Sequence, residues 1–116
     1  MIGTFSDLTM QAVERGLSGA AFRQRIAAHN VANVGTPGFR AQRVDFEASL
    51  ARALQTGGPV RYSVVPTPTI PNQSGNTVSL EAETQTLIKS DLYYEALTKA
   101  ASYKLGVVNA AVTGVK

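Results

Sequence analysis

The side chains that most often carry catalysis or metal binding are scarce in this sequence. It contains one histidine, His29, and no cysteine, so thiolate nucleophiles, disulfides and zinc–thiolate sites are excluded. A single histidine on an expected helix, with no cysteine or local acid, is typical of a packing or solvated residue rather than of a metal ligand. We therefore expect neither a metal nor an organic cofactor.

The acidic residues do not form a pattern suited to acid–base catalysis. Asp45 and Glu47 lie two residues apart, as do Glu81 and Glu83. On a helix, side chains at that spacing point away from each other, so these pairs do not suit a shared proton. The Gly-Gly-Pro run at 57–59 lacks the lysine and the following helix of a phosphate-binding loop, and no serine stands in a nucleophile-elbow motif. The sequence predicts a protein that is not an enzyme.

One polar cluster calls for a further explanation. Residues 30–40 read Asn-Val-Ala-Asn-Val-Gly-Thr-Pro-Gly-Phe-Arg. Asn33 and Gly35 can take the left-handed conformation that ends a helix, and residues 36–39 are typical of a type II turn. That interpretation does not account for asparagines at both 30 and 33, or for the aromatic residue directly after the turn. Asparagine side chains at a helix end can bond free backbone carbonyls and can reach a neighbouring chain.

The segment before this cluster is expected to be a long helix over residues 5–34, with Ser6-Asp7 as its N-cap. Apolar residues recur every three or four positions, as in a coiled coil, along a seam of Met10, Val13, Leu17, Ala20, Gln24, Ala27, Val31 and Val34. Gly16 and Gly19 each cost about 1 kcal/mol relative to alanine inside a helix. Such a helix depends on packing for its stability.

A second, longer helix is expected over residues 78–115. Its predicted seam includes Leu80, Leu87, Tyr94, Ala101, Leu105 and Val108, and a second apolar stripe comprises Ile88, Leu92 and Ala96. Glu81 and Glu83 in its first turn suit the positive end of the helix dipole.

Between the two helices, residues 35–77 are expected to hold the turn, a short helix and a flexible loop. Residues 45–54 predict the short helix, with Phe46, Leu50 and Leu54 on one face. Residues 60–65 alternate enough for one strand, but an isolated strand is rarely stable, so we expect an extended, mobile Pro/Gly-rich loop from 57 to 75. The predicted fold is a single all-α domain, 1–116, whose terminal helices form an antiparallel coiled-coil-like pair. Two helices cannot bury two wide apolar faces on each other, so we expect association with other chains.

Composition and charge limit the other functional classes. Only 16% of the residues are charged, and the formal net charge of +3 comes from seven arginines within the first 61 residues. The N-terminus lacks the basic and apolar regions of a signal peptide, and no window approaches the roughly 18 apolar residues of a membrane span. Two alternatives remain: a small helical nucleic-acid binder using Arg23, Arg25, Arg40 and Arg43, and a helical export chaperone.

The cluster after the first helix resembles the signature of bacterial flagellar rod, hook and hook-associated proteins. In that superfamily the N-terminal helix ends in Asn-x-x-Asn-x-x-Thr-Pro-Gly-aromatic, and the matching residues here are Asn30, Asn33, Thr36, Pro37, Gly38 and Phe39. The continuation through Asp45-Phe46, and the run from Asn76 to Ala96, are similar to the FlgB-type proximal rod proteins. The short length favours the same type, because distal rod and hook proteins insert a large domain where this chain has a loop.

The resemblance implies a structural subunit of the basal-body rod, exported by the flagellar type III apparatus without a cleaved signal peptide. The rod crosses the periplasmic space, and its subunits polymerise through their terminal helices around a central channel. The implied partners are other rod subunits, the rod–ring adaptor, the MS-ring and the export apparatus, with no nucleic acid and no membrane span. Another axial protein of the rod and hook superfamily is the nearest alternative.

Overall fold

The computed structural model describes residues 2–114, with side chains described from residue 8 onward except at 108, 111 and 112. Three helices and one two-stranded sheet follow in the order α1 (Ile2–Ala32), β1 (Gln42–Asp45), α2 (Glu47–Thr56), β2 (Ser63–Pro66) and α3 (Leu80–Thr113). The fold is therefore mostly helical, as predicted, but it contains a hairpin that the sequence analysis did not predict. The predicted seam residue Val108 lies outside the described side chains.

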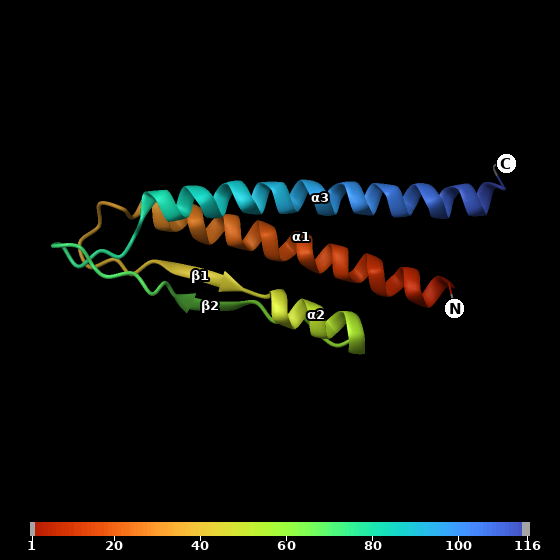
Figure 1. Cartoon of the computed structure of the whole chain (residues 1–116), viewed down its shortest axis with the longest axis horizontal. Helices are drawn as coiled ribbons and strands as arrows, with labels where there is room; N and C mark the ends of the chain where they lie inside the picture. Colours follow the sequence, from red (N-terminus) through yellow and green to blue (C-terminus); the bar gives the residue numbers. More distant parts are fainter. Residues whose placement is uncertain (1, 115–116) are drawn as a thin grey trace.

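The two long helices run side by side in opposite directions (Figure 1). Both chain ends lie at the same end of the molecule, and the helices diverge towards them (Figure 1). The chain measures 65 × 26 × 13 Å, with a radius of gyration of 18.2 Å. A compact domain of this length has a radius of gyration of about 13 Å. The molecule is thus an elongated rod rather than a globule.

Glycines inside α1 allow other elements to approach its backbone closely. A Cβ atom built on Gly16 would lie 2.8 Å from Leu97 of α3, and one built on Gly19 would lie 2.5 Å from the ring of Phe46. The low helix propensity of these residues is offset by the packing that they permit. Ala20 and Ala27 are also buried and continue this small-residue face.

The segment expected to be a mobile loop instead forms a strand, because it has a partner. β2 pairs antiparallel with β1, from Gln42 opposite Pro66 to Asp45 opposite Ser63. The hairpin lies along α1 on the side away from α3 (Figure 1), and Val44 of β1 is buried there. A strand that would be unstable alone is stabilised by its pairing and by the helix surface beneath it. The prediction of an extended loop over residues 57–75 was wrong for this part.

The short helix α2 begins two residues later and ends two residues later than predicted. Phe46 precedes the helix at its N-cap position, and Gly57 ends it in the left-handed conformation with φ 73°. The predicted apolar face is only partly correct, because Leu54 is exposed and Ala53 is the buried residue of this helix. The other two predicted residues of this face do pack, because Phe46 is buried and Leu50 is half-buried.

The long helices end differently from the sequence-based expectation. α1 begins at Ile2, so Ser6-Asp7 lies within the helix and is not its N-cap. Neither Asn33 nor Gly35 takes a positive φ angle, so the predicted left-handed cap of α1 is also wrong. At the start of α3, Ser79 is the N-cap, and its hydroxyl accepts a hydrogen bond of 3.2 Å from the backbone N–H of Ala82.

Candidate functional site

The predicted signature residues gather where α1 ends and α3 begins. We call this cluster, residues 29–42 with 72–79, the joint. Asn30 is fully buried, and its side chain holds one residue of β1 by both backbone groups. Its Nδ2 donates to the carbonyl of Gln42 at 2.7 Å, and its Oδ1 accepts from the N–H of Gln42 at 3.1 Å. This asparagine therefore fixes the direction in which the chain leaves the turn.

Asn33 closes the end of α1. Its Nδ2 donates to the free carbonyl of His29 at 2.8 Å, and its Oδ1 accepts from the hydroxyl of Thr36 at 3.1 Å. Backbone hydrogen bonds from Asn33 to Asn30 and from Val34 to Val31 tighten the last turn. The carbonyls of His29, Asn30 and Val31 are thus satisfied without a left-handed residue, which explains why the predicted cap is not needed.

The turn after the helix has the predicted geometry. Gly38 has φ 73°, and the N–H of Phe39 donates to the carbonyl of Thr36 at 3.2 Å. Thr36 and Pro37 are exposed, whereas Phe39 is half-buried and packs edge-on against His29, with ring centroids 5.5 Å apart. His29 is thus a packing residue in this structure, which matches its expected role.

The sequence analysis did not single out Asn76, which is the best-connected residue of the joint. Its buried Nδ2 donates to the carbonyls of Asn33 at 2.9 Å and Thr36 at 2.8 Å. Its Oδ1 accepts from the N–H of Val78 at 2.7 Å, just before α3. One side chain therefore ties the end of α1 to the start of α3. The available signal was a polar residue three positions before the N-cap Ser79, in a run that resembles the same protein family.

Thr77 adds a second buried tie across the joint. Its hydroxyl accepts from the backbone N–H of Ala41 at 2.7 Å, and its own N–H donates to the carbonyl of Phe39 at 3.0 Å. The joint is held by polar groups, and three of them, Asn30, Asn76 and Thr77, are buried with their partners, an arrangement that specifies one geometry.

Phe46 is the centre of the second cluster that the structure forms. Its buried ring lies under the guanidinium of Arg23, with the carbon atom Cζ 4.7 Å from the ring centroid. It also packs against the rings of Tyr62 and Tyr93, at 5.6 Å and 6.4 Å between centroids. This residue joins α1, the hairpin and α3. Its predicted neighbour Asp45 is exposed and pairs with Arg43 at 3.5 Å.

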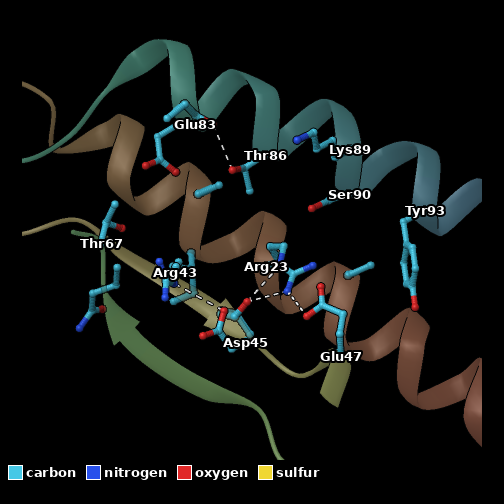
Figure 2. Close-up of a pocket in the computed structure, with 16 residues that line it drawn as sticks. Arg23, Arg43, Asp45, Glu47, Thr67, Glu83, Thr86, Lys89, Ser90 and Tyr93 are labelled. Atoms are coloured by element: carbon cyan, nitrogen blue, oxygen red, sulfur yellow. Dashed lines mark hydrogen bonds and ion pairs between the residues drawn. The ribbon is translucent and has the colours of Figure 1, made fainter. Parts of the chain in front are cut away.

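Arg23 connects α1 to the hairpin on the other side of Phe46. Its Nη2 lies 2.6 Å from the carbonyl of Val44 and 2.7 Å from the carboxylate of Glu47 (Figure 2). The bond from Arg23 lowers the pKa of Glu47, because it stabilises the ionised carboxylate. The hydroxyl of Tyr62 donates to the carbonyl of Arg15 at 2.7 Å, and burial raises the pKa of this tyrosine.

The predicted seam residues divide into those that pack within the chain and those that do not. On α1, Val13 and Ala27 are buried, and Leu17 and Val31 are half-buried. On α3, Leu87 and Ala101 are half-buried, whereas the exposed seam residues are Leu80, Tyr94 and Leu105. The face of α3 that packs towards α1 includes Glu83, Ser90 and Leu97, which lie seven residues apart. The role of the seam in assembly stays a prediction.

None of the described helices contains an apolar stretch long enough to cross a membrane.

Comparison with known proteins gives consistent matches over nearly the whole chain. No family model matches the sequence. The flagellar basal body rod protein FlgB of Bacillus subtilis is 29% identical, over 93% of this chain and 95% of that protein. The FlgB proteins of Escherichia coli and Salmonella typhimurium are 26% and 28% identical, over 93% and 89% of this chain and 96% and 92% of theirs. Over nearly its whole length the chain is therefore similar to the FlgB-type flagellar basal body rod proteins, and this similarity supports a structural role in the rod.

Proposed function

We propose that this subunit polymerises into the proximal rod through the outward faces of its two long helices. The observation that carries this proposal is an apolar line on α3. Ile88, Leu92 and Tyr103 are 56%, 59% and 76% exposed. At 100° per residue they share one side of the helix, roughly opposite the Ser90 and Leu97 side that packs towards α1. Burial of this line needs another chain.

The extent of the exposed surface supports the same proposal. The chain exposes 7784 Å², whereas a compact monomer of 12.3 kDa exposes about 6,100 Å². Other large apolar side chains are exposed on the same helix, namely Leu80, Tyr94, Leu105 and Val107. An elongated subunit with apolar helix faces gains stability when copies stack side by side, as the concentric helical layers of a rod require.

The proposed partners are other rod subunits, the rod–ring adaptor, the MS-ring and the export apparatus. In this proposal export precedes assembly, and the subunit travels from the cytoplasm to the periplasmic space. A chain with marginal stability suits passage in an unfolded state, followed by folding on the growing structure. The assembled helices transmit torque, because many buried contacts per subunit make the structure stiff.

The arginines proposed for the nucleic-acid alternative are mostly engaged within the chain. Arg23 binds Glu47, Arg43 binds Asp45, and Arg25 lies over a phenylalanine ring with its Cζ 5.6 Å from the centroid. This arrangement favours structural roles for three of the four residues.

The test is to isolate basal bodies from the source bacterium and probe the washed particles for the chain. We expect the chain in the rod, and we expect rods to be missing when its gene is deleted. Leu92→Glu should prevent incorporation while leaving the melting temperature of the isolated chain unchanged. Gln55→Glu adds the same charge on the exposed part of α2 and should have no effect. Complete rods in the deletion strain would refute the proposal.

A further inference from the structure

A hollow of about 440 Å³ lies between α1, β1 and the first four turns of α3 (Figure 2). On the α1 side it is lined by the small buried side chains of Ala20 and Ala27, together with Arg23 and Ile26. The volume corresponds to about fifteen water molecules at 30 Å³ each. The hollow is therefore large enough for a side chain from another molecule.

Most charged groups that line the hollow are already paired with each other. Arg23 binds Glu47 at 2.7 Å, and Arg43 binds Asp45 at 3.5 Å. The remaining cation, Lys89, is exposed at the rim of the hollow. The remaining anion is Glu83, which is a buried residue, unlike the exposed Lys89.

Glu83 is mostly buried as a residue, and its carboxylate borders the hollow without a partner in the described part of the chain. The residue is only 6% exposed, and its side chain makes no hydrogen bond or ion pair within residues 8–114 that the structure describes. Figure 2 shows the carboxylate on the side of α3 that faces α1. A carboxylate that borders a hollow without a protein partner is free to receive a basic group from another chain, and such a pair forms a strong charge-assisted hydrogen bond.

Ser90 provides an independent observation in the same hollow. The residue is 3% exposed, and its hydroxyl is a buried polar atom without a hydrogen-bond partner among the described residues. Figure 2 shows this hydroxyl directed from α3 towards α1. Unsatisfied buried hydroxyls are rare in folded proteins, and they indicate a missing ligand or water.

The spacing of the two groups indicates what kind of partner fits. Glu83 and Ser90 are seven residues apart, which is about 10 Å along the helix. A single small cation cannot contact both groups. A peptide segment can, because its basic head group reaches Glu83 while a backbone group bonds the hydroxyl of Ser90.

We propose that this hollow binds an arginine-bearing segment of a second copy of this chain, with Arg40 as the inserted residue. The inference rests on the proposed rod assembly, which brings copies into contact. A guanidinium group has five donors and forms strong paired bonds with a carboxylate. Arg40 is exposed, and its guanidinium has no hydrogen bond or ion pair in the described part of the chain. It lies at the joint, so it can meet the side of an axial neighbour.

The other arginines are less suitable for this role. Arg15 binds the carbonyl of Gly58, and three further arginines are held by Phe22, Glu47 and Asp45 as described above. Arg52 and Arg61 line a second hollow that also contains carboxylates of the same chain. Arg40 is the arginine that remains without such a neighbour.

The direct test is zero-length carbodiimide cross-linking of basal bodies that carry Arg40→Lys. This reagent joins an amine to a carboxylate only when the two are in contact. We expect a cross-linked dimer in which the amine introduced at position 40 is joined to Glu83, identified by peptide mass spectrometry. The dimer should be absent from the wild-type chain and from Arg40→Lys combined with Glu83→Gln. Incorporated Arg40→Lys chains that lack this link, or that carry it within one chain, would overturn the inference.

A second measurement does not depend on Arg40→Lys being incorporated. Glu83→Gln removes the unpaired charge, so we expect the isolated chain to melt at the same or a higher temperature while incorporation into rods falls at least tenfold. Glu81→Gln, an exposed residue of the same helix turn, should change neither quantity. Equal incorporation of the two variants would overturn the inference and leave the proposed function intact. Absence of the wild-type chain from basal bodies would instead refute the proposed function.

Discussion

The two ends of this molecule are held in different ways. At the joint, buried asparagine and threonine side chains bond the backbone between the two helices, and Asn30, Asn76 and Thr77 have their partners within the chain. At the other end, which we call the open end (α1 before Val13 and α3 after Ala101), the helices diverge (Figure 1). There Tyr103 and Leu105 are exposed.

This difference indicates which part of the fold the isolated chain forms without a neighbouring subunit. Buried polar networks specify one geometry, because each unsatisfied group carries a cost. An apolar helix face favours burial against another surface, but it does not fix the geometry of that contact. We therefore expect the joint to be formed in the isolated subunit, and the open end to become ordered when neighbouring subunits cover it.

Asn76→Ala should have the largest effect on the joint. It removes the donor for the carbonyls of Asn33 and Thr36 and the acceptor for the N–H of Val78. Leaving such buried groups unsatisfied should lower the free energy of unfolding by about 2–4 kcal/mol. Urea denaturation followed by circular dichroism measures this change. Gln73→Ala, an exposed residue in the same loop, is the control and should stay within about 0.5 kcal/mol of the wild type.

Glycine-to-alanine substitutions in the two long helices should have opposite effects. At Gly19 the added Cβ meets the ring of Phe46, so Gly19→Ala should destabilise the chain by about 1–3 kcal/mol despite better helix propensity. At Gly106 nothing lies within 4 Å, so Gly106→Ala should stabilise the isolated chain by up to about 1 kcal/mol. Thermal melting of both variants gives the signs. Stabilisation by both would contradict the packing of Phe46 on α1.

Within the joint, substitutions at two glycines should lower the free energy of unfolding by different amounts, because the two backbone conformations differ. Gly38 has φ 73° and Gly35 does not have a positive φ, and neither has a neighbour within 4 Å of a built Cβ. Gly38→Val should therefore cost at least about 1–2 kcal/mol through backbone strain alone, whereas Gly35→Val should cost less. Similar losses of unfolding free energy in both variants would mean that the type II turn is not needed.

The smallest expected effect is a pH dependence from Glu47. Its pKa is lowered in the folded chain by the hydrogen bond from Arg23, so the bond stabilises the fold above the ordinary carboxyl pKa. This contribution should disappear as the pH falls through the lowered pKa. The side chain of Glu47 is more than half exposed, so the effect should be well below 1 kcal/mol. Glu47→Gln should flatten the acid side of the stability curve, and an unchanged curve would contradict the role of this hydrogen bond.

The helices and the turn could be predicted because their signals are local. Heptad spacing identified both long helices, and Pro37-Gly38 identified the turn. The hairpin could not be predicted in this way, since β2 is stable only because β1, some twenty residues earlier, pairs with it. The left-handed cap of α1 was mispredicted because the side chain of Asn33 and tightened backbone hydrogen bonds take carbonyls of the last helical turn. Asn76, much later in the sequence, bonds the carbonyls of Asn33 and Thr36 beyond the helix end.

The packing face of α3 shows a second limit of sequence patterns. A search for apolar periodicity selects Leu80, Tyr94 and Leu105, which are exposed in this chain. The face that packs towards α1 includes Glu83 and Ser90, which such a search passes over. Polar residues within a helix interface are visible only when the partner helix is placed.

Amide hydrogen exchange, measured by mass spectrometry, tests the contrast between the joint and the open end most directly. Peptides covering residues 26–41 and 76–90 should be protected both in the isolated chain and in purified basal bodies. Peptides covering residues 98–110 should exchange rapidly in the isolated chain and become protected only in basal bodies. If residues 98–110 are as well protected in the isolated chain as the joint, then the open end does not depend on assembly and the account is wrong.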